Sequence, residues 1–542
     1  MRRRQRLLLL AASSGALLGW TFSPYGGPAL PFLAFAPLAV ALAALRSDRS
    51  AGHPASLAPM ALGFATAAVA HGIGLYWMVP ALSWRTPLAV PIYLLVLTLI
   101  GVVAGAACQA AMFIHGRARW PLPLALACCW TGFEWAAARA PGVPYAWLNA
   151  GQSLVWHPSL AAGVEVLGAR FMAFWTVMVG AAVAALLASR GTERVRTAAA
   201  VAALAGVPAI GGAVRQAGLD GEMSGAGNAV LRGESEVLRV AAVQTGRAQG
   251  DLEAWLDPLE ELHATGPLDL VAFPERHLPV LLREPGAERP TAAGARVAES
   301  ARLLGLPVVV GALDAEALPA DARDTLWYNA AFLQSPDGTL SAPYRKERLV
   351  PGVEGTGWAG STLGALSRGY AAGRGSRPLV LLDDGTSSSS GGLTRAPTVA
   401  PVGVMICYDS AFEATARELM GSGAGWLLVI SNDDWLDPQR TFRTTWAYWQ
   451  HATHARLRAV EHRVPVVQVA ATGYTFAVSA AGRGDRRALG PGERGVAVAE
   501  VTPSPGGSLY TRTGDLLGLA CFAIFALATA WWAIGRPLVR LA

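Results

Sequence analysis

Three reactive side chains in the second half of the chain each follow a strand-like segment. Glu275 follows LDLVAFP, Lys346 follows a hairpin in LSAPYRKERLVP, and Cys407 follows PVGVMI. Ligands of layered α/β sheets tend to meet the carboxyl ends of strands, so we expect the three groups to lie at one site. A carboxylate, an ammonium and a thiol together point to nucleophilic catalysis through a thioester.

Each group has a defined task in such a reaction. A free thiol has a pKa of roughly 8.5, so Cys407 needs a base, and Glu275 is the candidate. Lys346 and the backbone N–H after Cys407 are candidate oxyanion donors, and each such donor is commonly worth about 3–4 kcal/mol. No GxxxxGK[ST] phosphate-binding run is evident, so nothing in the sequence points to ATP as a co-substrate.

Packing is the alternative interpretation of Cys407, because free cysteine is among the most buried residue types. The other cysteines all lie in apolar segments: Cys108, Cys128, Cys129 and Cys521. Cys407 alone lies in the large domain that, as argued below, faces outward, where disulfides normally form. Without a second cysteine nearby, its thiol is either deeply buried or reactive.

Histidines are the competing bases. His277 lies two residues after Glu275, and His451, His454 and His462 lie in an expected helix. We expect those three to occupy a partly exposed helix face rather than to act as base or metal ligand. No carboxylate clearly completes a metal triplet there, so we expect no metal and no cofactor.

The composition is that of a membrane protein. The 542 residues are 53% hydrophobic and only 15% charged, whereas soluble domains are about a quarter charged. The net charge of +6 does not indicate nucleic-acid binding, because the arginines of the first half cluster between apolar segments and form no basic stripe.

Eight apolar segments approach or exceed the length needed to span a bilayer, about 17–25 residues. They are residues 7–22, 29–45, 57–81, 87–115, 121–138, 168–189, 197–214 and 514–535. The first resembles a signal peptide, but a second apolar segment follows so closely that we expect no cleavage. Most arginines fall on one side when eight helices alternate from a cytoplasmic N-terminus, so the large domain after the seventh helix faces outward.

Between the last two apolar segments, strand and helix signals alternate, as in an α/β domain built on a mixed sheet. The expected strands are 237–243, 268–273, 307–311, 328–334, 340–344, 402–407, 426–431 and 464–470, with a last hairpin from 475 onward. The expected helices are 249–264, 291–304, 411–420 and 441–462. We therefore divide the chain into a seven-helix bundle (1–215), a linker (216–236), an extracytoplasmic catalytic domain (237–505) and a C-terminal transmembrane helix (512–536).

The motifs FPE, YRKERLVP and CYD resemble the Glu-Lys-Cys signature of the nitrilase, or carbon–nitrogen hydrolase, superfamily. An outward nitrilase-like domain between seven helices and one more is similar to the bacterial apolipoprotein N-acyltransferases. The resemblance implies an α-β-β-α sandwich in the cytoplasmic (inner) membrane, acting from the periplasmic side. It implies Glu275 as general base, Lys346 as the lysine that stabilises the transition state and Cys407 as nucleophile.

The resemblance also implies the substrates and some supporting residues. An acyl chain passes from a phospholipid to the thiol, and then to the amine of the diacylglyceryl-cysteine of an apolipoprotein. Glu354 falls where the family has a further glutamate, although its flanks differ, and Tyr408 and Asp409 stand where the family often has CYE. Candidate substrate-binding aromatic residues are Trp255, Trp358 and Trp435, the last within SNDDW.

Two other functions remain open. A tethered amidase or nitrilase would keep the three reactive groups and use water as acceptor, but tethering needs only one helix. A transporter or scaffold with a dead domain fits poorly with the intact Glu, Lys and Cys and the few intramembrane charges. We expect a monomer in the lipid bilayer, since no signal for oligomerisation is evident.

Overall fold

The computed structural model describes residues 3–46, 57–231, 237–286, 289–317, 325–355, 369–380, 400–437, 445–484 and 488–534. The chain divides into two compact units. The helical unit comprises Met1–Gly218, Pro438–Thr453 and Arg512–Ala542, and the sheet unit comprises Leu219–Asp437 and His454–Thr511.

All eight apolar segments of the sequence lie in helices of the helical unit. Its helices are α1 (Arg3–Thr21), α2 (Leu30–Leu33), α3 (Ala36–Arg46), α4 (Ala58–Gly74), α5 (Met78–Ser83), α6 (Ala89–Arg117), α7 (Leu122–Ala138), η1 (Gln152–Trp156), α8 (Pro158–Ala161), α9 (Val164–Leu167), α10 (Arg170–Ala188), the first part of α11 (Gly191–Leu231) and α18 (Leu516–Ile534). Among the described residues, four helices are long and apolar enough to cross a membrane, namely α6, α10, α11 and α18. These helices fit a membrane protein.

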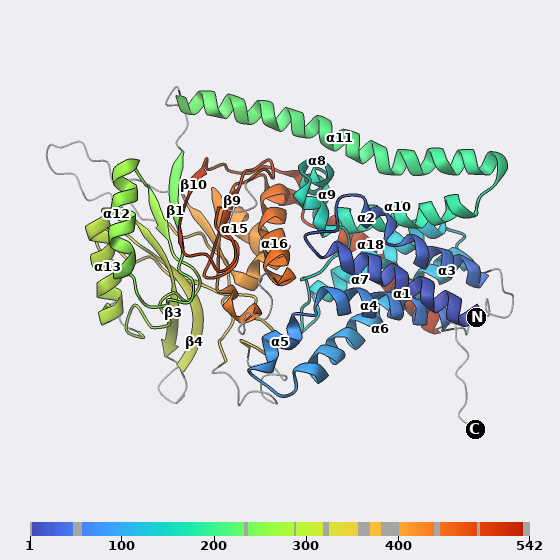
Figure 1. Ribbon diagram of the computed structural model, residues 1–542, viewed down its shortest axis with the longest axis horizontal. Helices are drawn as coiled ribbons and strands as arrows, with labels where there is room; N and C mark the ends of the chain where they lie inside the picture. The colour runs from blue at the N-terminus through green and yellow to red at the C-terminus, as the bar shows by residue number, and fades with distance from the viewer. Residues whose placement is uncertain are drawn as a thin grey trace. The chain divides into compact units, whose positions relative to one another are not determined.

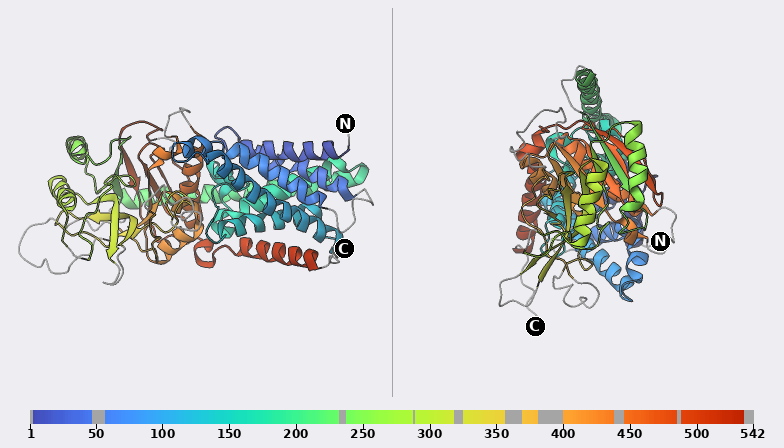
Figure 2. Two further views of the ribbon diagram at one scale, coloured as in Figure 1. Left: turned by 90° about the horizontal axis from the view of Figure 1, so that it is seen from below. Right: turned by 90° about the vertical axis from the view of Figure 1, so that its left-hand side faces the viewer.

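The last helix packs into the bundle although it is remote in sequence. Figure 2 shows α18 running beside the other helices, and it contacts α7 and α6. A Cβ on Gly132 of α7 would lie 2.5 Å from the carbonyl oxygen of Cys521 in α18. Small residues of this kind let membrane helices approach closely, so Gly132 explains where α18 docks.

Helix α11 extends further than the sequence suggests. We expected a linker over 216–236, but the helix continues to Leu231 despite Pro208 in its interior. Once a helix has formed, each added residue gains a hydrogen bond, so the glycines of this segment do not end it.

The first turns of α16 (Trp446–His462) belong to the helical unit. The Gln450 side chain is fully buried there. Its Oε1 accepts hydrogen bonds from the indole Nε1 of Trp77 (3.0 Å) and of Trp147 (2.8 Å). Its Nε2 donates to the carbonyl oxygens of Phe22 (3.2 Å) and Gly74 (2.9 Å). One amide therefore joins three loops of the bundle to α16.

The sheet unit contains two β-sheets, as the α-β-β-α sandwich implied by the resemblance requires. The six-stranded sheet has the order β10-β1-β2-β3-β4-β5, and the four-stranded sheet has the order β6-β7-β8-β9. The strands are β1 (Leu238–Gln244), β2 (Leu270–Ala272), β3 (Val308–Ala317), β4 (Thr325–Gln334), β5 (Tyr344–Arg345), β6 (Val402–Ile406), β7 (Trp426–Ser431), β8 (Val466–Ala470), β9 (Phe476–Val478) and β10 (Gly495–Val501).

Among the described residues, the expected last hairpin is reduced to one antiparallel bridge, between Thr475 and Leu489. Strand β9 pairs with β8, whereas β10 crosses to the other sheet and pairs antiparallel with β1 over seven residues. Hydrophobic alternation identifies a strand but not its partner, which is why the sequence suggested a local pairing.

Helices cover the outer faces of both sheets. Figure 1 shows α12 (Leu256–Thr265) and α13 (Ala292–Leu304) beside the six-stranded sheet, and α15 (Glu413–Gly421) and α16 beside the four-stranded one. The core under α12 and α13 consists of fully buried apolar side chains such as Leu259, Val271 and Phe332. The α-β-β-α layering implied by the resemblance is thus present. The remaining elements are η2 (Glu253–Trp255), η3 (Cys407–Ala411), η4 (Asp433–Leu436) and α17 (Leu509–Thr513).

Candidate active site

Lys346 lies between two carboxylates in the sheet unit. It directly follows β5, and its backbone N–H donates to the Asn329 carbonyl of β4 (2.8 Å). The side chain is 1% exposed, and its Nζ donates to Oε1 of Glu275 (3.1 Å) and to Oε1 of Glu354 (2.9 Å). Burial alone would lower the pKa of Lys346, but the two carboxylates outweigh it and hold the pKa well above its usual value. The lysine is therefore charged and fixed in place.

Glu275 is held by three different donors. Its Oε1 accepts from the Asn329 Nδ2 (2.6 Å) as well as from Lys346, and its Oε2 accepts from the Asn432 backbone N–H (2.8 Å). The side chain is only 5% exposed. The next residue, Arg276, has a φ of +51°, which is strained for a residue with a side chain. The turn after β2 is thereby tight enough to aim the carboxylate inward.

Cys407 is the first residue of η3, directly after β6, and it too has a φ of +51°. It is 4% exposed, yet its surroundings are charged rather than apolar. Burial and the Glu275 carboxylate raise the pKa of the thiol well above its usual value, while the Lys346 ammonium opposes the rise. A strained backbone and charged neighbours are typical of a functional residue, whereas a cysteine that only packs has neither.

Glu354 joins this cluster as a second carboxylate. Its Oε2 accepts from the Val350 backbone N–H (2.9 Å), and its Oε1 accepts from Lys346 and from the Asn329 Nδ2 (3.2 Å). The ammonium of Lys346 thus bridges the carboxylates of Glu275 and Glu354. The expected absence of a metal stays a prediction.

Asp409 holds the loop that carries the thiol. It is fully buried and accepts from the Tyr344 hydroxyl (2.8 Å) and from the backbone N–H groups of Arg348 (2.7 Å) and Ile406 (3.0 Å). Burial raises the pKa of Asp409 to about 7, against the opposing effect of Lys346. Tyr408 is buried, with its ring 5.0 Å from that of Phe412. Asp409 therefore ties the Cys407 turn to the segment that carries Lys346.

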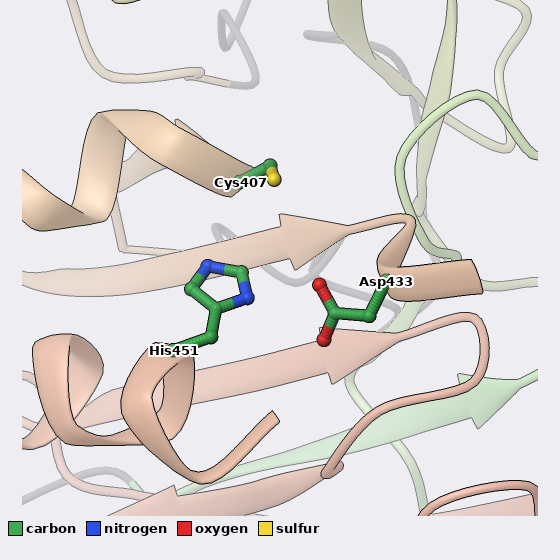
Figure 3. A group of neighbouring side chains, drawn as sticks. All are labelled: Cys407, Asp433 and His451. Atoms are coloured by element: carbon green, nitrogen blue, oxygen red, sulfur yellow. The ribbon is translucent and has the colours of Figure 1, made fainter. Parts of the chain in front are cut away.

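A third carboxylate lies beside the thiol. Asp433 begins η4 after β7 and is fully buried. One of its carboxylate oxygens lies within 4.8 Å of the Cys407 Sγ. Figure 3 shows both side chains, which come from the ends of neighbouring strands and, for Asp433, from the SNDDW motif.

The histidines are buried, which corrects our expectation of a partly exposed helix face. His451, His454 and His462 are each 0% exposed on α16. The His462 Nδ1 lies 2.9 Å from the Thr511 hydroxyl. The His277 ring stacks on Phe273 at 4.8 Å, and among the described residues neither of its ring nitrogens has a hydrogen-bond partner. His277 thus points into the apolar core and is not a bonded partner of the thiol.

The three tryptophans predicted to bind substrate differ in what the structure shows of them. Trp255 is 4% exposed and belongs to the hydrophobic core under the six-stranded sheet, which is a position typical of packing. Trp435 is half-buried in η4. Trp358 lies outside the described residues. Substrate binding by these residues stays a prediction.

Sequence reasoning missed Asn329, Tyr344 and Asp433 as site residues. Asn329 could have been suspected from the sequence, because asparagine is rare in the middle of a strand. From its place in β4 it donates hydrogen bonds to Glu275 and Glu354. Asp433 is part of the SNDDW motif, but its neighbour Asp434 looks equivalent in the sequence and is half-buried. Only the fold shows that Asp433, and not Asp434, lies beside the thiol.

The arrangement can perform acyl transfer. A thiol, a carboxylate able to take its proton, and a fixed ammonium able to stabilise an oxyanion are gathered at the strand ends of the two sheets. All three were predicted from the sequence to lie together. Glu275 and Lys346 share a hydrogen bond, and the charges of both act on the Cys407 thiol; the individual roles of the three remain predictions.

The chain is similar to known protein families and to curated proteins. Residues 239–509, half of the chain, match the carbon-nitrogen hydrolase family, and residues 14–182 match the apolipoprotein N-acyltransferase N-terminal domain. The chain is 27% identical to an apolipoprotein N-acyltransferase of Bradyrhizobium diazoefficiens, covering 96% of this chain and 94% of that protein. It is 28% identical to one from Bordetella bronchiseptica, covering 97% and 96%.

Solved structures with similarity include Saccharomyces cerevisiae Nit3, a member of branch 10 of the nitrilase superfamily. The match has a TM-score of 0.36 at 20% identity and covers 52% of this chain and 96% of that chain. An amidase from Nesterenkonia sp. matches with a TM-score of 0.32 at 20% identity, covering 51% and 92%.

Proposed function

Because the chain belongs to the carbon-nitrogen hydrolase family and, within it, to the apolipoprotein N-acyltransferases, we propose the following reaction for it. The enzyme transfers an acyl chain from a membrane phospholipid to the N-terminal amine of the diacylglyceryl-cysteine of apolipoproteins, through a thioester on Cys407. The observation that carries the proposal is the buried Lys346 bridging Glu275 and Glu354 next to the thiol.

In the first half-reaction, Glu275 takes the proton of the Cys407 thiol as the sulfur attacks the phospholipid ester carbonyl. The raised pKa of the thiol means that it rests protonated, so the proton leaves only as the bond to carbon forms. Lys346 stabilises the oxyanion, and Glu275 returns the proton to the departing lysophospholipid oxygen. Glu354 holds the ammonium in place from its other side.

In the second half-reaction, the amine of the acceptor attacks the thioester carbonyl. The carbon–nitrogen bond forms, the carbon–sulfur bond breaks, and the thiol is restored. Water would give a free fatty acid instead, so the enzyme must hold the acceptor more effectively than it admits water.

We further propose eight membrane-spanning segments and an extracytoplasmic catalytic domain over 237–505. The arginine distribution supports this orientation, and the helical character of all eight apolar segments supports the number. The protein would act as a monomer in the bacterial inner membrane, with its catalytic domain on the periplasmic side, where both the phospholipid donor and the lipoprotein acceptor reside.

The test uses the purified full chain and a phospholipid labelled in its acyl chains. We expect a hydroxylamine-labile label on Cys407 that moves to a diacylated lipopeptide when the lipopeptide is added. Cys407→Ser should abolish the label while leaving the thermal unfolding midpoint unchanged. Absence of the adduct, or its release only as free acid, would exclude the acyltransferase and favour an amidase-like hydrolase.

A further inference from the structure

Asp433 is a buried acidic residue at the nucleophile that the reaction above leaves without a task. It is 0% exposed, and one of its carboxylate oxygens lies within 4.8 Å of the Cys407 Sγ. Glu275, the candidate base, is anchored to the same loop by the backbone N–H of Asn432, one residue before Asp433. The loop after β7 therefore brings two carboxylates to the thiol.

A glycine leaves room for the Asp433 carboxylate. Gly473 follows β8, and a Cβ at that position would lie 2.0 Å from Oδ2 of Asp433. No side chain fits there without moving the aspartate. The close approach indicates that the position of the Asp433 carboxylate is built into two neighbouring strand ends and is not that of a mobile surface group.

Glu275 is poorly placed to serve the acceptor as well as the thiol. A carboxylate offers about four lone-pair positions, and three of those on Glu275 already accept from Lys346, Asn329 and Asn432. Lys346 lies directly on it and would repel a second cation. An α-ammonium approaching the thioester therefore needs a negative group on a different side of Cys407.

We propose that Asp433 binds the α-ammonium of the acceptor and takes the proton that the nitrogen must lose before it can attack. This inference rests on the proposed function, since it assigns the second half-reaction of the same site. The acceptor class it implies is a primary ammonium.

The geometry allows the contact. An attacking nitrogen lies about 3–3.5 Å from the carbonyl carbon in a near-attack arrangement, and that carbon is bonded to Sγ. A carboxylate oxygen within 4.8 Å of Sγ can therefore reach hydrogen-bond distance of a nitrogen that approaches from the side of Asp433.

The step balances. The ammonium gives one proton to Asp433, and the nitrogen lone pair forms the bond to the acyl carbon. The carbon–sulfur bond breaks and its electron pair goes to Sγ. The second nitrogen-bound proton passes directly to the departing thiolate, which leaves an amide and a free thiol. Asp433 then releases its proton to solvent.

The experiment separates the two half-reactions in the full chain carrying Asp433→Asn. Labelled phospholipid alone should give the Cys407 thioester at a rate within a few-fold of the unmodified enzyme. Transfer to the diacylated lipopeptide should fall by about 100-fold or more, the usual contribution of a positioned base. Release by hydroxylamine, which is uncharged at neutral pH, should change only a few-fold. Asp434→Asn is the matched control and should alter none of the three rates.

The outcomes are distinguishable. Equal losses in thioester formation and transfer, or an unchanged transfer rate, would overturn the role of Asp433. A loss of hydroxylamine release as large as the loss of transfer would also overturn it. Failure of the unmodified enzyme to form any thioester would instead remove the proposed function.

A second measurement needs no variant. A lipopeptide with a dimethylated N-terminus keeps a cation with one N–H donor but cannot form the amide. It should inhibit transfer in the unmodified enzyme more strongly than the N-acetylated lipopeptide does, by about tenfold. Equal inhibition by the two would contradict recognition of the ammonium by a carboxylate.

Discussion

A Cβ added to Gly311 of β3 would lie 2.8 Å from the Cα of Glu275 and 2.5 Å from the backbone nitrogen of Arg276. The turn that carries the candidate base thus passes directly over a strand position that has no side chain. Two such contacts cannot form without displacing backbone, so the position of the carboxylate depends on a glycine 36 residues further along the chain.

Gly311→Ala should therefore reduce thioester formation more than it reduces stability. A displacement of about 1 Å at a catalytic group can lower a rate about 100-fold, and we expect a loss of that order in labelling of Cys407. Gly421→Ala in α15 is the matched control, since a Cβ there meets nothing within 4 Å. Full labelling of the Gly311 variant would contradict the dependence.

Lys346→Met should leave Glu275 and Glu354 as two buried carboxylates without their shared cation. Removing one partner of a buried pair commonly costs about 3–5 kcal/mol, so the thermal unfolding midpoint should fall and thioester formation should be lost. The double variant Lys346→Met, Glu354→Gln should recover much of the midpoint without recovering the thioester. If the single variant unfolds at the normal temperature, the two carboxylates are not held by the lysine.

His277→Phe should make the stability of the sheet unit less sensitive to acid. Burial lowers the pKa of His277 from 6.5 to about 4, so between these values the unfolded chain binds one more proton than the folded chain. The contribution of a neutral His277 to stability is therefore complete above about 6.5 and is lost as the pH falls toward about 4.

The measurement for His277 is the unfolding midpoint at several pH values. In His277→Phe the decline between neutral and acidic pH should be shallower, because phenylalanine keeps the stacking on Phe273 and has no ring nitrogen to protonate. Thioester formation should remain, since the ring is not the base. Loss of the thioester in this variant would restore the histidine as a competing base.

Gln450→Leu should destabilise the helical unit. The leucine would leave the indole N–H groups of Trp77 and Trp147 and the carbonyls of Phe22 and Gly74 without the partner seen here. Each buried polar group left unsatisfied costs about 1–3 kcal/mol, so the unfolding midpoint in detergent should fall by several degrees or more. Gln249→Leu, at an exposed position, is the control and should have little effect.

Much of the site could be predicted because strand ends are local features. Apolar runs before Glu275, Lys346 and Cys407 predicted the strands that carry them, and each strand ends within a few residues of the expected position. Layered sheets bring such ends together, so the reactive groups could be placed at one site without coordinates.

What the sequence could not supply depends on pairing and packing between distant segments. Nothing local distinguishes Asp433 from Asp434, or marks Gly311 as the partner of the Glu275 turn. Trp255 was a candidate substrate-binding residue through the resemblance, and nothing in its local sequence showed that its neighbours fill a core cluster. The linker expected over 216–236 was drawn from composition, whereas helix extension to Leu231 follows from cooperativity.

Strand β10 pairs with β1 along its whole length, from Leu238 opposite Val501 to Gln244 opposite Gly495. Contacts between segments so far apart in sequence form late in folding. Because β10 lies near the end of the chain, this edge of β1 remains unpaired during synthesis until nearly the entire chain has left the ribosome. A nascent chain that stops before residue 495 would expose the edge of β1 and could not complete the six-stranded sheet. We therefore expect such truncated chains to aggregate or to be degraded, and not to acylate lipoproteins.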